Sequence, residues 1–318
     1  MPRPYIRTAI IDIGTNTITL LIADVATDGT YQVLHDEARV VRLGEGLNQY
    51  ARFLPEPMNR AFAVLADFQK IILKNLCVTV YVVGTAGFRK AQNAVDLITR
   101  VQTELGMTIT VISGEREADL VFSSVRFDPL FKNLPQPFAA LDIGGGSTEL
   151  IIDDVNFHHA VSLPFGSVVL TERFLPSDPP APAELKQLDD FICEQLAANV
   201  EFTKVSGPAH LVATAGTATT LAALVQNLKS YDAGKVHGSV VSVAALKSLA
   251  KKLQNLKMAE RQMLPCLEPK RADVIVAGVH ILLSVCQFLN VSQFAVSDRG
   301  LRYGVLFATL SRAEAGVM

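Results

Sequence analysis

The pattern of hydrophobic and polar positions occurs twice along the chain, 130 residues apart. Residues 12–25 (DIGTNTITLLIADV) align without a gap with residues 142–155 (DIGGGSTELIIDDV), and seven positions are identical. Each copy has an apolar run on either side of a turn of Gly, Thr, Asn or Ser, which predicts a β-hairpin. Chance similarity is the alternative, but the identical positions include Asp and Gly as well as aliphatic residues. A duplication predicts two domains of matching topology, each beginning with such a hairpin, that face one another across a cleft.

Later segments of the two halves also share an order of elements. Residues 78–93 and 209–224 both predict a strand, a glycine-centred turn and a helix, and residues 111–125 join a strand to a helix through Ser113 and Gly114. Strands that alternate with helices in this way predict an α/β fold.

Connections and further helices complete this prediction. Residues 127–138 are rich in proline and aromatic residues and are expected to connect the two halves, and the proline-rich residues 175–184 are expected to form a loop before a helix at 185–203. Residues 246–262 have apolar positions at helical spacing and a lysine face, for which a solvated surface is favoured over a track for a polyanion. The uncharged residues 274–297 include His, Gln and Asn, so they predict a buried helix followed by a strand and not a membrane span.

The composition excludes several classes of protein. Hydrophobic residues make up 49% and charged residues 19% of the 318 residues, which suits two buried cores and not a disordered chain. The formal net charge is -2 without a long run of one sign, which argues against a nucleic-acid partner. The N-terminal apolar run contains an Asp and does not fit a signal peptide. The four cysteines lack CxxC or zinc-site spacing and are expected to be buried, reduced thiols of a cytoplasmic protein: Cys77, Cys193, Cys266 and Cys286.

The two hairpin turns have the composition of a phosphate-binding site. A protein of nearly neutral charge can hold a phosphate chain with successive backbone N–H groups, where Gly permits a close approach, and with hydroxyl side chains. No GxxxxGK[ST] segment is present, so a Walker-type NTPase is not expected. A plain hairpin turn is the alternative for either segment taken alone. The candidate phosphate-binding residues are Gly14, Thr15, Asn16 and Thr17 in the first turn and Gly144, Gly145, Gly146, Ser147 and Thr148 in the second.

Carboxylates beside these turns predict a divalent cation. Asp12 and Asp142 begin the two turns, and Glu149 follows the second. A carboxylate repels a phosphate chain unless a cation lies between them, and Mg²⁺ uses one or two carboxylates together with phosphate oxygens and waters. Asp12, Asp142 and Glu149 are therefore the candidate metal ligands. The alternative is that each Asp accepts N–H bonds within its own turn.

An acidic helix start and an arginine complete the candidate site. Glu115, Glu117 and Asp119 lie in the first turns of the helix after Gly114, where they either complement the helix dipole or include a general base for an attacking water. The pattern alone does not choose among the three. Arg89 stands at a helix start, where a cation opposes the dipole, so an anionic ligand is expected beside it.

These motifs resemble the Ppx/GppA family of exopolyphosphatases and guanosine pentaphosphate phosphohydrolases. The resemblance covers nearly the whole chain in family order, through the segments DIGTNT, VVRLGEGL, GTAGFRKAQN, ISGEREADL, LDIGGGSTEL, GTATTLAAL, KRADVIVAGVHIL and SDRGLRYGVL. It implies two ribonuclease-H-like domains of the actin/Hsp70/sugar-kinase (ASKHA) superfold around a central cleft. The expected domains are residues 1–125, joined by a C-terminal helix at about 302–318, and residues 126–301.

The resemblance also implies roles for particular residues. Glu117 resembles the catalytic base, Arg89 the arginine that holds the phosphate chain, and Asp142 and Glu149 the acids near Mg²⁺. Arg42 and Arg271 are further candidates for anion contact. Tyr303 stands where the family often has Glu, and the chain ends before the C-terminal helical domains of the long members, which implies less processive action or a preference for short chains.

The function expected from the sequence is Mg²⁺-dependent hydrolytic removal of the terminal phosphate of polyphosphate, with conversion of pppGpp to ppGpp as a further expectation. The resemblance suggests a cytoplasmic homodimer. Two other classes of protein stay open: a small-molecule kinase of the same superfold, and a regulator that binds (p)ppGpp without turnover.

Overall fold

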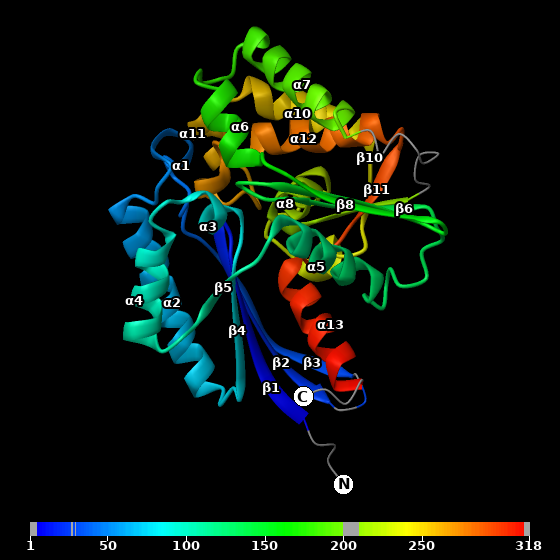
Figure 1. Ribbon diagram of the computed structural model, residues 1–318. Helices are drawn as coiled ribbons and strands as arrows, with labels where there is room; N and C mark the ends of the chain where they lie inside the picture. Colours follow the sequence, from blue (N-terminus) through cyan, green and yellow to red (C-terminus); the bar gives the residue numbers. More distant parts are fainter. Residues whose placement is uncertain (1–4, 27, 29, 200–209, 315–318) are drawn as a thin grey trace. The chain divides into compact units, whose positions relative to one another are not determined.

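The computed structural model describes residues 5–26, 28, 30–199 and 210–314 and divides the chain into two compact units (Figure 1). The first unit comprises Met1–Ser124 and Leu301–Met318, and the second comprises Val125–Gly300. The first unit is therefore built from two separate stretches of the chain, because its last helix follows the whole of the second unit.

The first unit has a five-stranded mixed sheet of order β3-β2-β1-β4-β5. Strands β1, β2 and β3 form an antiparallel meander, and β4 and β5 continue the sheet parallel to β1. The bounds of the strands are β1 Tyr5–Ile13, β2 Thr17–Ala26, β3 Tyr31–Val40, β4 Thr79–Gly84 and β5 Ile109–Val111. The predicted first hairpin is thus confirmed, with Asp12 directly opposite Thr19.

Helices cover both faces of this sheet. The helices are α1 Leu47–Tyr50, α2 Pro55–Lys74, α3 Ala86–Lys90, α4 Ala94–Leu105, α5 Gly114–Arg126 at the unit boundary, and α13 Leu301–Glu314. Apolar side chains of α2 and α4, such as Phe68 and Leu97, pack with Ile11 and Leu20 of the sheet. Helix α13 lies against β1 and β2 on the side away from α2 and α4 (Figure 1).

The second unit repeats this order in a six-stranded sheet, β10-β11-β9-β6-β7-β8. Its strands are β6 Phe138–Ile143, β7 Thr148–Asp154, β8 Phe157–Leu163, β9 His210–Thr214, β10 Val240–Ser242 and β11 Gln293–Val296. Strands β6, β7 and β8 form the antiparallel meander, and β9 and β11 run parallel to β6, as β4 and β5 do to β1. The two sheets share the ribonuclease-H-like order, so the predicted α/β fold and the second hairpin are confirmed.

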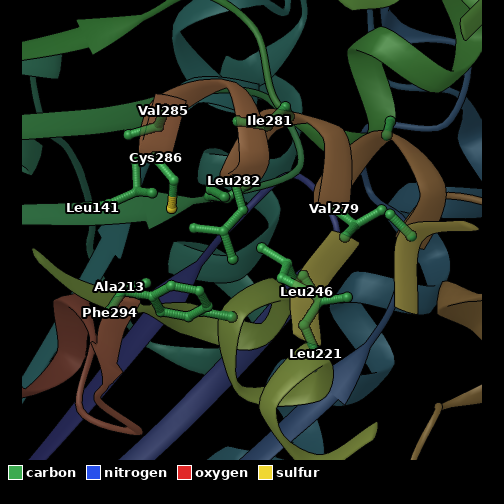
Figure 2. Close-up of a cluster of buried hydrophobic side chains, with 14 of the residues drawn as sticks. Leu141, Ala213, Leu221, Leu246, Val279, Ile281, Leu282, Val285, Cys286 and Phe294 are labelled. Carbon is green, nitrogen blue, oxygen red and sulfur yellow. The ribbon is translucent and has the colours of Figure 1, made fainter. Parts of the chain in front are cut away.

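An apolar helix fills the centre of the second unit. Eleven of the fourteen residues of α12, Ile275–Phe288, are buried, because other helices and the sheet surround it. Figure 2 shows Val279, Leu282 and Cys286 of α12 packed with side chains from β6, β9, α8, α10 and β11. The remaining helices are α6 Ser167–Phe174, α7 Pro182–Ala197, α8 Ala215–Val225, α9 Ala233–Val236, α10 Val243–Asn255, α11 Met258–Gln262 and a 3₁₀ turn at Pro269–Arg271. The predicted helix followed by a strand within 274–297 is confirmed, and no helix in the described part of the chain is long and apolar enough to cross a membrane.

Three predicted elements differ in the structure. The single helix expected at 246–262 is two helices, because the backbone is extended at Leu256 and Lys257 and the Glu260 side chain accepts a hydrogen bond from the Lys257 N–H (2.8 Å), which starts α11. Helix α7 begins three residues earlier than predicted, at Pro182, where Pro suits the first turn, and it ends at Ala197. Residues 200–203 of that prediction lie outside the described residues. The predicted connector ends before Phe138, which is already part of β6.

The cysteines are all free, as expected, but their burial was predicted incorrectly for three of them. Cys286 is buried, Cys77 and Cys266 are partly buried, and Cys193 is exposed. Cys193 lies on α7, where the buried positions Leu188, Ile192 and Leu196 recur at helical spacing and leave it on the solvent side.

Candidate active site

The tip of the first hairpin is held by the loop that follows β3. The Gly14 N–H donates to the Thr17 carbonyl (3.0 Å) and closes the turn. The N–H groups of Val41 and Arg42 both donate to the Asn16 carbonyl, at 3.0 and 2.9 Å, which fixes the turn from outside. Arg42 has a φ of 55° there, in the left-handed region, so its backbone is strained in the conformation that makes this contact.

Gly44 and Thr15 continue the same contact. The Gly44 N–H donates to the Thr15 carbonyl (2.8 Å), and a Cβ at Gly44 would lie 2.1 Å from Thr15 Cγ2. Only Gly permits this approach. On the other side of Thr15, Gly87 at the start of α3 is so close that a Cβ there would lie 3.4 Å from the Thr15 hydroxyl.

Polar side-chain atoms at the tip of this hairpin are buried without a hydrogen-bond partner among the described residues, namely Thr15 Oγ1, Asn16 Oδ1 and Thr19 Oγ1. Buried polar atoms are normally paired, and an atom without a partner calls for a bound group or water. The pattern fits a phosphate-binding turn, in which hydroxyl and amide groups contact the ligand. Thr19 was not predicted as a site residue; its position opposite Asp12 in the hairpin register could have indicated it.

Glu117 and Arg89 form an ion pair in the first unit. Arg89 Nη1 donates to Glu117 Oε2 at 2.6 Å and to the Ile112 carbonyl at 3.0 Å. Of the three acids at the start of α5, Glu117 is buried, with 7% of its surface exposed, whereas Glu115 and Asp119 are exposed. The structure therefore distinguishes Glu117 from its two neighbours, which the sequence pattern could not do.

Opposing influences act on the Glu117 carboxyl. Burial raises the pKa of Glu117 above its ordinary value of 4.5, and the Arg89 charge and hydrogen bonds from Arg89 and Thr85 counteract this only in part. A buried carboxylate with a raised pKa is a stronger base than one in water and is typical of a catalytic position.

The second turn is fixed by the start of α6. The Gly144 N–H donates to the Ser147 carbonyl (3.0 Å), which repeats the closure seen at Gly14. The carbonyls of Gly144 and Gly145 accept from the N–H groups of Ser167 (2.9 Å) and Val168 (3.0 Å). Because the first residues of α6 donate hydrogen bonds to these carbonyls, the turn is held in one conformation.

Gly166 makes this contact possible and was not predicted as a site residue. A Cβ there would lie 2.5 Å from the Gly144 carbonyl oxygen and 2.6 Å from the Gly145 carbonyl carbon. The sequence signal that could have found it is a Gly shortly after the third strand of each unit, which is Gly44 in the first unit and Gly166 in the second. Both contact the hairpin tip of their own unit. Two predicted hydroxyls of the second turn are buried, Ser147 and Thr148, and Thr148 Oγ1 donates to the Phe165 carbonyl (2.8 Å).

Asp142 and Glu149 form a pair of acids on one face of the second sheet. They are directly opposite each other in the antiparallel pair β6–β7, so their side chains are neighbours. Both are buried, with 8% and 1% of their surface exposed. Ser162 of β8 donates to Glu149 Oε1 at 2.6 Å, and Gly300 is close enough to Asp142 that a Cβ there would lie 3.6 Å from Oδ2.

This pair meets the requirement of Mg²⁺ for one or two carboxylate ligands. Two adjacent buried acids repel each other unless a cation or a proton is present, which favours a cation here. Among the described residues no group of three His, Cys, Asp or Glu side chains could hold a metal alone, so oxygens of a substrate or water would complete the coordination. Asp12, the third predicted ligand, belongs to the other unit and has Thr19 opposite it where Asp142 has Glu149.

Arg271 lies against the start of α8. A Cβ at Gly216 would be 1.9 Å from Arg271 Nη1, so the guanidinium rests on the bare backbone of Gly216. Burial lowers the pKa of Arg271, while the charges of Glu268 and Tyr231 raise it. Ala215 has a φ of 63°, which places strain in this turn. Strain, a partly buried cation and a helix start together agree with the predicted anion contact, which stays a prediction.

Tyr303 has a structural contact. Its hydroxyl donates to Asp36 Oδ2 (2.9 Å), and Arg302 Nε donates to Asp36 Oδ1 (2.8 Å), so both residues of α13 are tied to β3. The expectation that the two turns share a cleft stays a prediction, as do the roles assigned to the individual residues.

The chain is similar to known proteins over nearly its whole length. The model of the Ppx/GppA phosphatase family matches residues 21–313. Exopolyphosphatase 2 of Mycobacterium tuberculosis is 33% identical over 311 residues, covering 94% of this chain and 97% of the relative. The crystal structure of the Aquifex aeolicus Ppx/GppA family member has a TM-score of 0.80 with 31% identity, covering 97% of this chain and 99% of that one. That of an exopolyphosphatase from Cytophaga hutchinsonii has a TM-score of 0.87 with 29% identity, covering 96% and 98%.

Proposed function

The chain belongs to the Ppx/GppA phosphatase family, and from this membership we propose that it is an exopolyphosphatase, a phosphoanhydride hydrolase that removes the terminal phosphate of inorganic polyphosphate. The relatives named as exopolyphosphatases match over nearly their whole length, which supports the same activity here. Hydrolysis of pppGpp to ppGpp is a second reaction of the same chemistry and belongs to the proposal. A cytoplasmic location and a homodimer belong to it as well.

The observation that carries the proposal is the buried Glu117 held by Arg89. Hydrolysis of a phosphoanhydride needs a group that orients a water and accepts its proton, and a buried carboxylate with a raised pKa suits this task. In the proposed reaction the water oxygen bonds to the terminal phosphorus, the bridging P–O bond breaks, and the shortened chain leaves. A proton of the water passes to Glu117 Oε1 or Oε2. Arg89 keeps the carboxyl in place and in its ionised form before the reaction.

Other residues of each unit bind and orient. In the first unit, the turn Gly14–Thr17 offers the hydroxyl of Thr15 and the amide of Asn16. The Thr15 hydroxyl and the Asn16 amide oxygen have no hydrogen-bond partner among the described residues. In the second unit, the turn Gly144–Ser147 offers backbone N–H groups and the Ser147 hydroxyl, held in place by the start of α6. Preorganised donors of this kind stabilise developing phosphate charge without having to reorganise.

Mg²⁺ is part of the proposal, with Asp142 and Glu149 as its protein ligands. When bound there, Mg²⁺ would neutralise charge on the phosphate oxygens. Asp142 and Glu149 are held on one face by the β6–β7 register, and Ser162 orients Glu149. These contacts keep the two carboxylates adjacent, as two ligands of one cation must be.

The test is Glu117→Gln, assayed for phosphate release with Mg²⁺ from long polyphosphate, short polyphosphate and pppGpp side by side. We expect a loss of turnover of about 10²–10⁴-fold with polyphosphate binding retained, because a general base contributes about this much. The matched control is Glu104→Gln, which removes a Glu–Arg pair at Arg100 on an exposed helix surface and should leave turnover unchanged. Wild-type turnover in Glu117→Gln would exclude Glu117 as the base.

Adding ATP with a small acceptor to this assay, and measuring the binding of pppGpp, separates the two other classes of protein. Phosphate transfer from ATP to an added small acceptor, with little free phosphate, would identify a kinase. Tight binding of pppGpp without release of phosphate from any substrate would identify a regulator. Either result would overturn the proposed hydrolase.

A further inference from the structure

A buried acid outside the predicted site contacts the loop that approaches Asp142. Asp128 follows α5 and its side chain is fully buried. Its Oδ1 accepts from the Leu130 N–H (2.8 Å), and its Oδ2 accepts from Arg299 Nη1 (3.2 Å). A buried carboxylate lowers the stability of the fold unless it is paired, so losing either of these contacts would be destabilising.

His237 joins the same cluster from another segment of the second unit. Its Nε2 lies 3.6 Å from Asp128 Oδ2, and its ring packs edge-on against Phe131 at 5.6 Å between centroids. Its Nδ1 accepts a hydrogen bond from the Asp298 N–H (3.3 Å). Asp128 therefore contacts the segment 297–300 twice, directly through Arg299 and indirectly through His237.

The charge state of Asp128 is set by these partners. Burial by itself raises the pKa of Asp128, but the interaction with His237, the hydrogen bond from the Leu130 N–H and the charge of Arg299 outweigh it, and the pKa is lowered overall. Asp128 is thus ionised at neutral pH and holds Arg299 as a charged partner.

The segment 297–300 ends at the acid pair. The Ser297 N–H donates to the Ala213 carbonyl (2.9 Å) at the end of β9, and the Arg299 N–H donates to Ser297 Oγ (3.1 Å). The next residue, Gly300, lies beside Asp142: a Cβ on it would be 3.6 Å from Asp142 Oδ2 and 3.9 Å from the Ala215 nitrogen. A shift of this segment would therefore change the space around the Asp142 carboxylate.

We propose that Asp128, with His237 and Arg299, is a positioning residue for the reaction: it fixes the segment 297–300 against Asp142 and so keeps the carboxylate in the position that the reaction requires. This inference rests on the proposed function. Asp128 does not touch the reacting atoms in this role. Its effect reaches them through Arg299 and Gly300.

The test compares Asp128→Asn with the wild-type chain in two measurements. Asn keeps the size of the side chain and an acceptor for the Leu130 N–H, but it loses the charge that holds Arg299. We expect kcat for polyphosphate to fall by about tenfold or more while KM changes by less than about threefold, because a misplaced catalytic group lowers turnover more than binding. We also expect faster amide hydrogen exchange in residues 297–300 in the protein without substrate or metal.

Two further variants make the result decisive. Asp178→Asn removes another Asp–Arg pair of the second unit, with Arg261 (2.8 Å), and should leave kcat and exchange at 297–300 unchanged. Arg299→Gln removes the other partner at a side chain that is 27% exposed, so it tests the same contact if Asp128→Asn does not fold. It should reproduce the loss of kcat and the faster exchange.

Two outcomes would overturn the inference. One is wild-type kcat in a folded Asp128→Asn or Arg299→Gln variant. The other is a loss of kcat without faster exchange at 297–300. A wild-type chain that releases no phosphate from polyphosphate would instead refute the proposed function, and this result is recognised before any variant is compared.

Discussion

Replacing Gly166 by Ala is the sharpest test of how the second turn is held. The added Cβ would lie 2.5 Å from the Gly144 carbonyl oxygen and 2.7 Å from the Gly145 carbonyl oxygen, and both are backbone atoms that cannot rotate away. An ordinary contact is about 3.4 Å or longer, so either the turn or the start of α6 must move by about 0.9 Å. The hydrogen bonds from Ser167 and Val168 to these carbonyls would lengthen or break.

The expected magnitude follows from this displacement. Overpacking of this size costs about 1–3 kcal/mol of folding free energy, which a chain with two large cores tolerates. A misplacement of about 1 Å in a catalytic site costs about 10²-fold in rate. Gly166→Ala should therefore remain folded, with a lower melting temperature, and lose about 10²-fold in kcat for polyphosphate.

The assay is phosphate release with Mg²⁺ together with thermal unfolding of the same samples. Gly106→Ala is the control, because Gly106 caps α4 with a φ of 64° and has no atom within 4 Å of an added Cβ. It should lose about 1–2 kcal/mol of stability, since Ala is strained in that conformation, and keep its kcat. A folded Gly166→Ala variant with kcat within about twofold of wild type would show that the start of α6 does not position the turn.

Three further results are expected. Burial raises the pKa of Glu117, and a general base acts in its deprotonated form, so kcat/KM should fall as pH is lowered, with a midpoint above 4.5. A fall of kcat/KM with a midpoint at or below 4.5 would contradict the assignment of Glu117 as the base. Ser162→Ala removes the hydrogen bond to Glu149 and should lower kcat about tenfold at saturating Mg²⁺, while circular dichroism shows an unchanged fold. Wild-type kcat in this variant would show that Glu149 does not depend on this hydrogen bond. Asp36→Ala removes the hydrogen-bond acceptor of Tyr303 and Arg302 on α13 and should lower the free energy of unfolding by about 2 kcal/mol in urea titrations. An unchanged urea midpoint would mean that apolar packing alone holds α13.

The features predicted correctly from the sequence are those that depend on short-range pattern. The two hairpins follow from apolar runs on both sides of a Gly-containing turn, and the duplicated Asp and Gly positions locate both turns. The break between α10 and α11 was missed because helical spacing of apolar residues continues through it, while the cause is local: the side chain of Glu260 starts a new helix at Lys257.

The features missed from the sequence depend on contacts between distant residues. Gly166 is 22 residues from Gly144 in the sequence, and it reaches the second hairpin turn only because β8 pairs with β7. Asp128 and Arg299 are 171 positions apart and carry no local motif. Glu117 was predicted through the resemblance of its motif, whereas the local pattern left three acids open; in the structure, burial and the contact with Arg89 distinguish it.

The position of α13 in the chain has a consequence for biosynthesis. Strands β1 and β2 leave the ribosome early, but the helix that packs on them is translated only after the whole second unit. The second unit is continuous and can complete its core while the first still lacks a layer, which reverses the usual sequence in which the earlier domain matures first. Until Tyr303 reaches Asp36, the nascent chain exposes one face of its first sheet, and this interval is when it is most exposed to aggregation and to capture by chaperones.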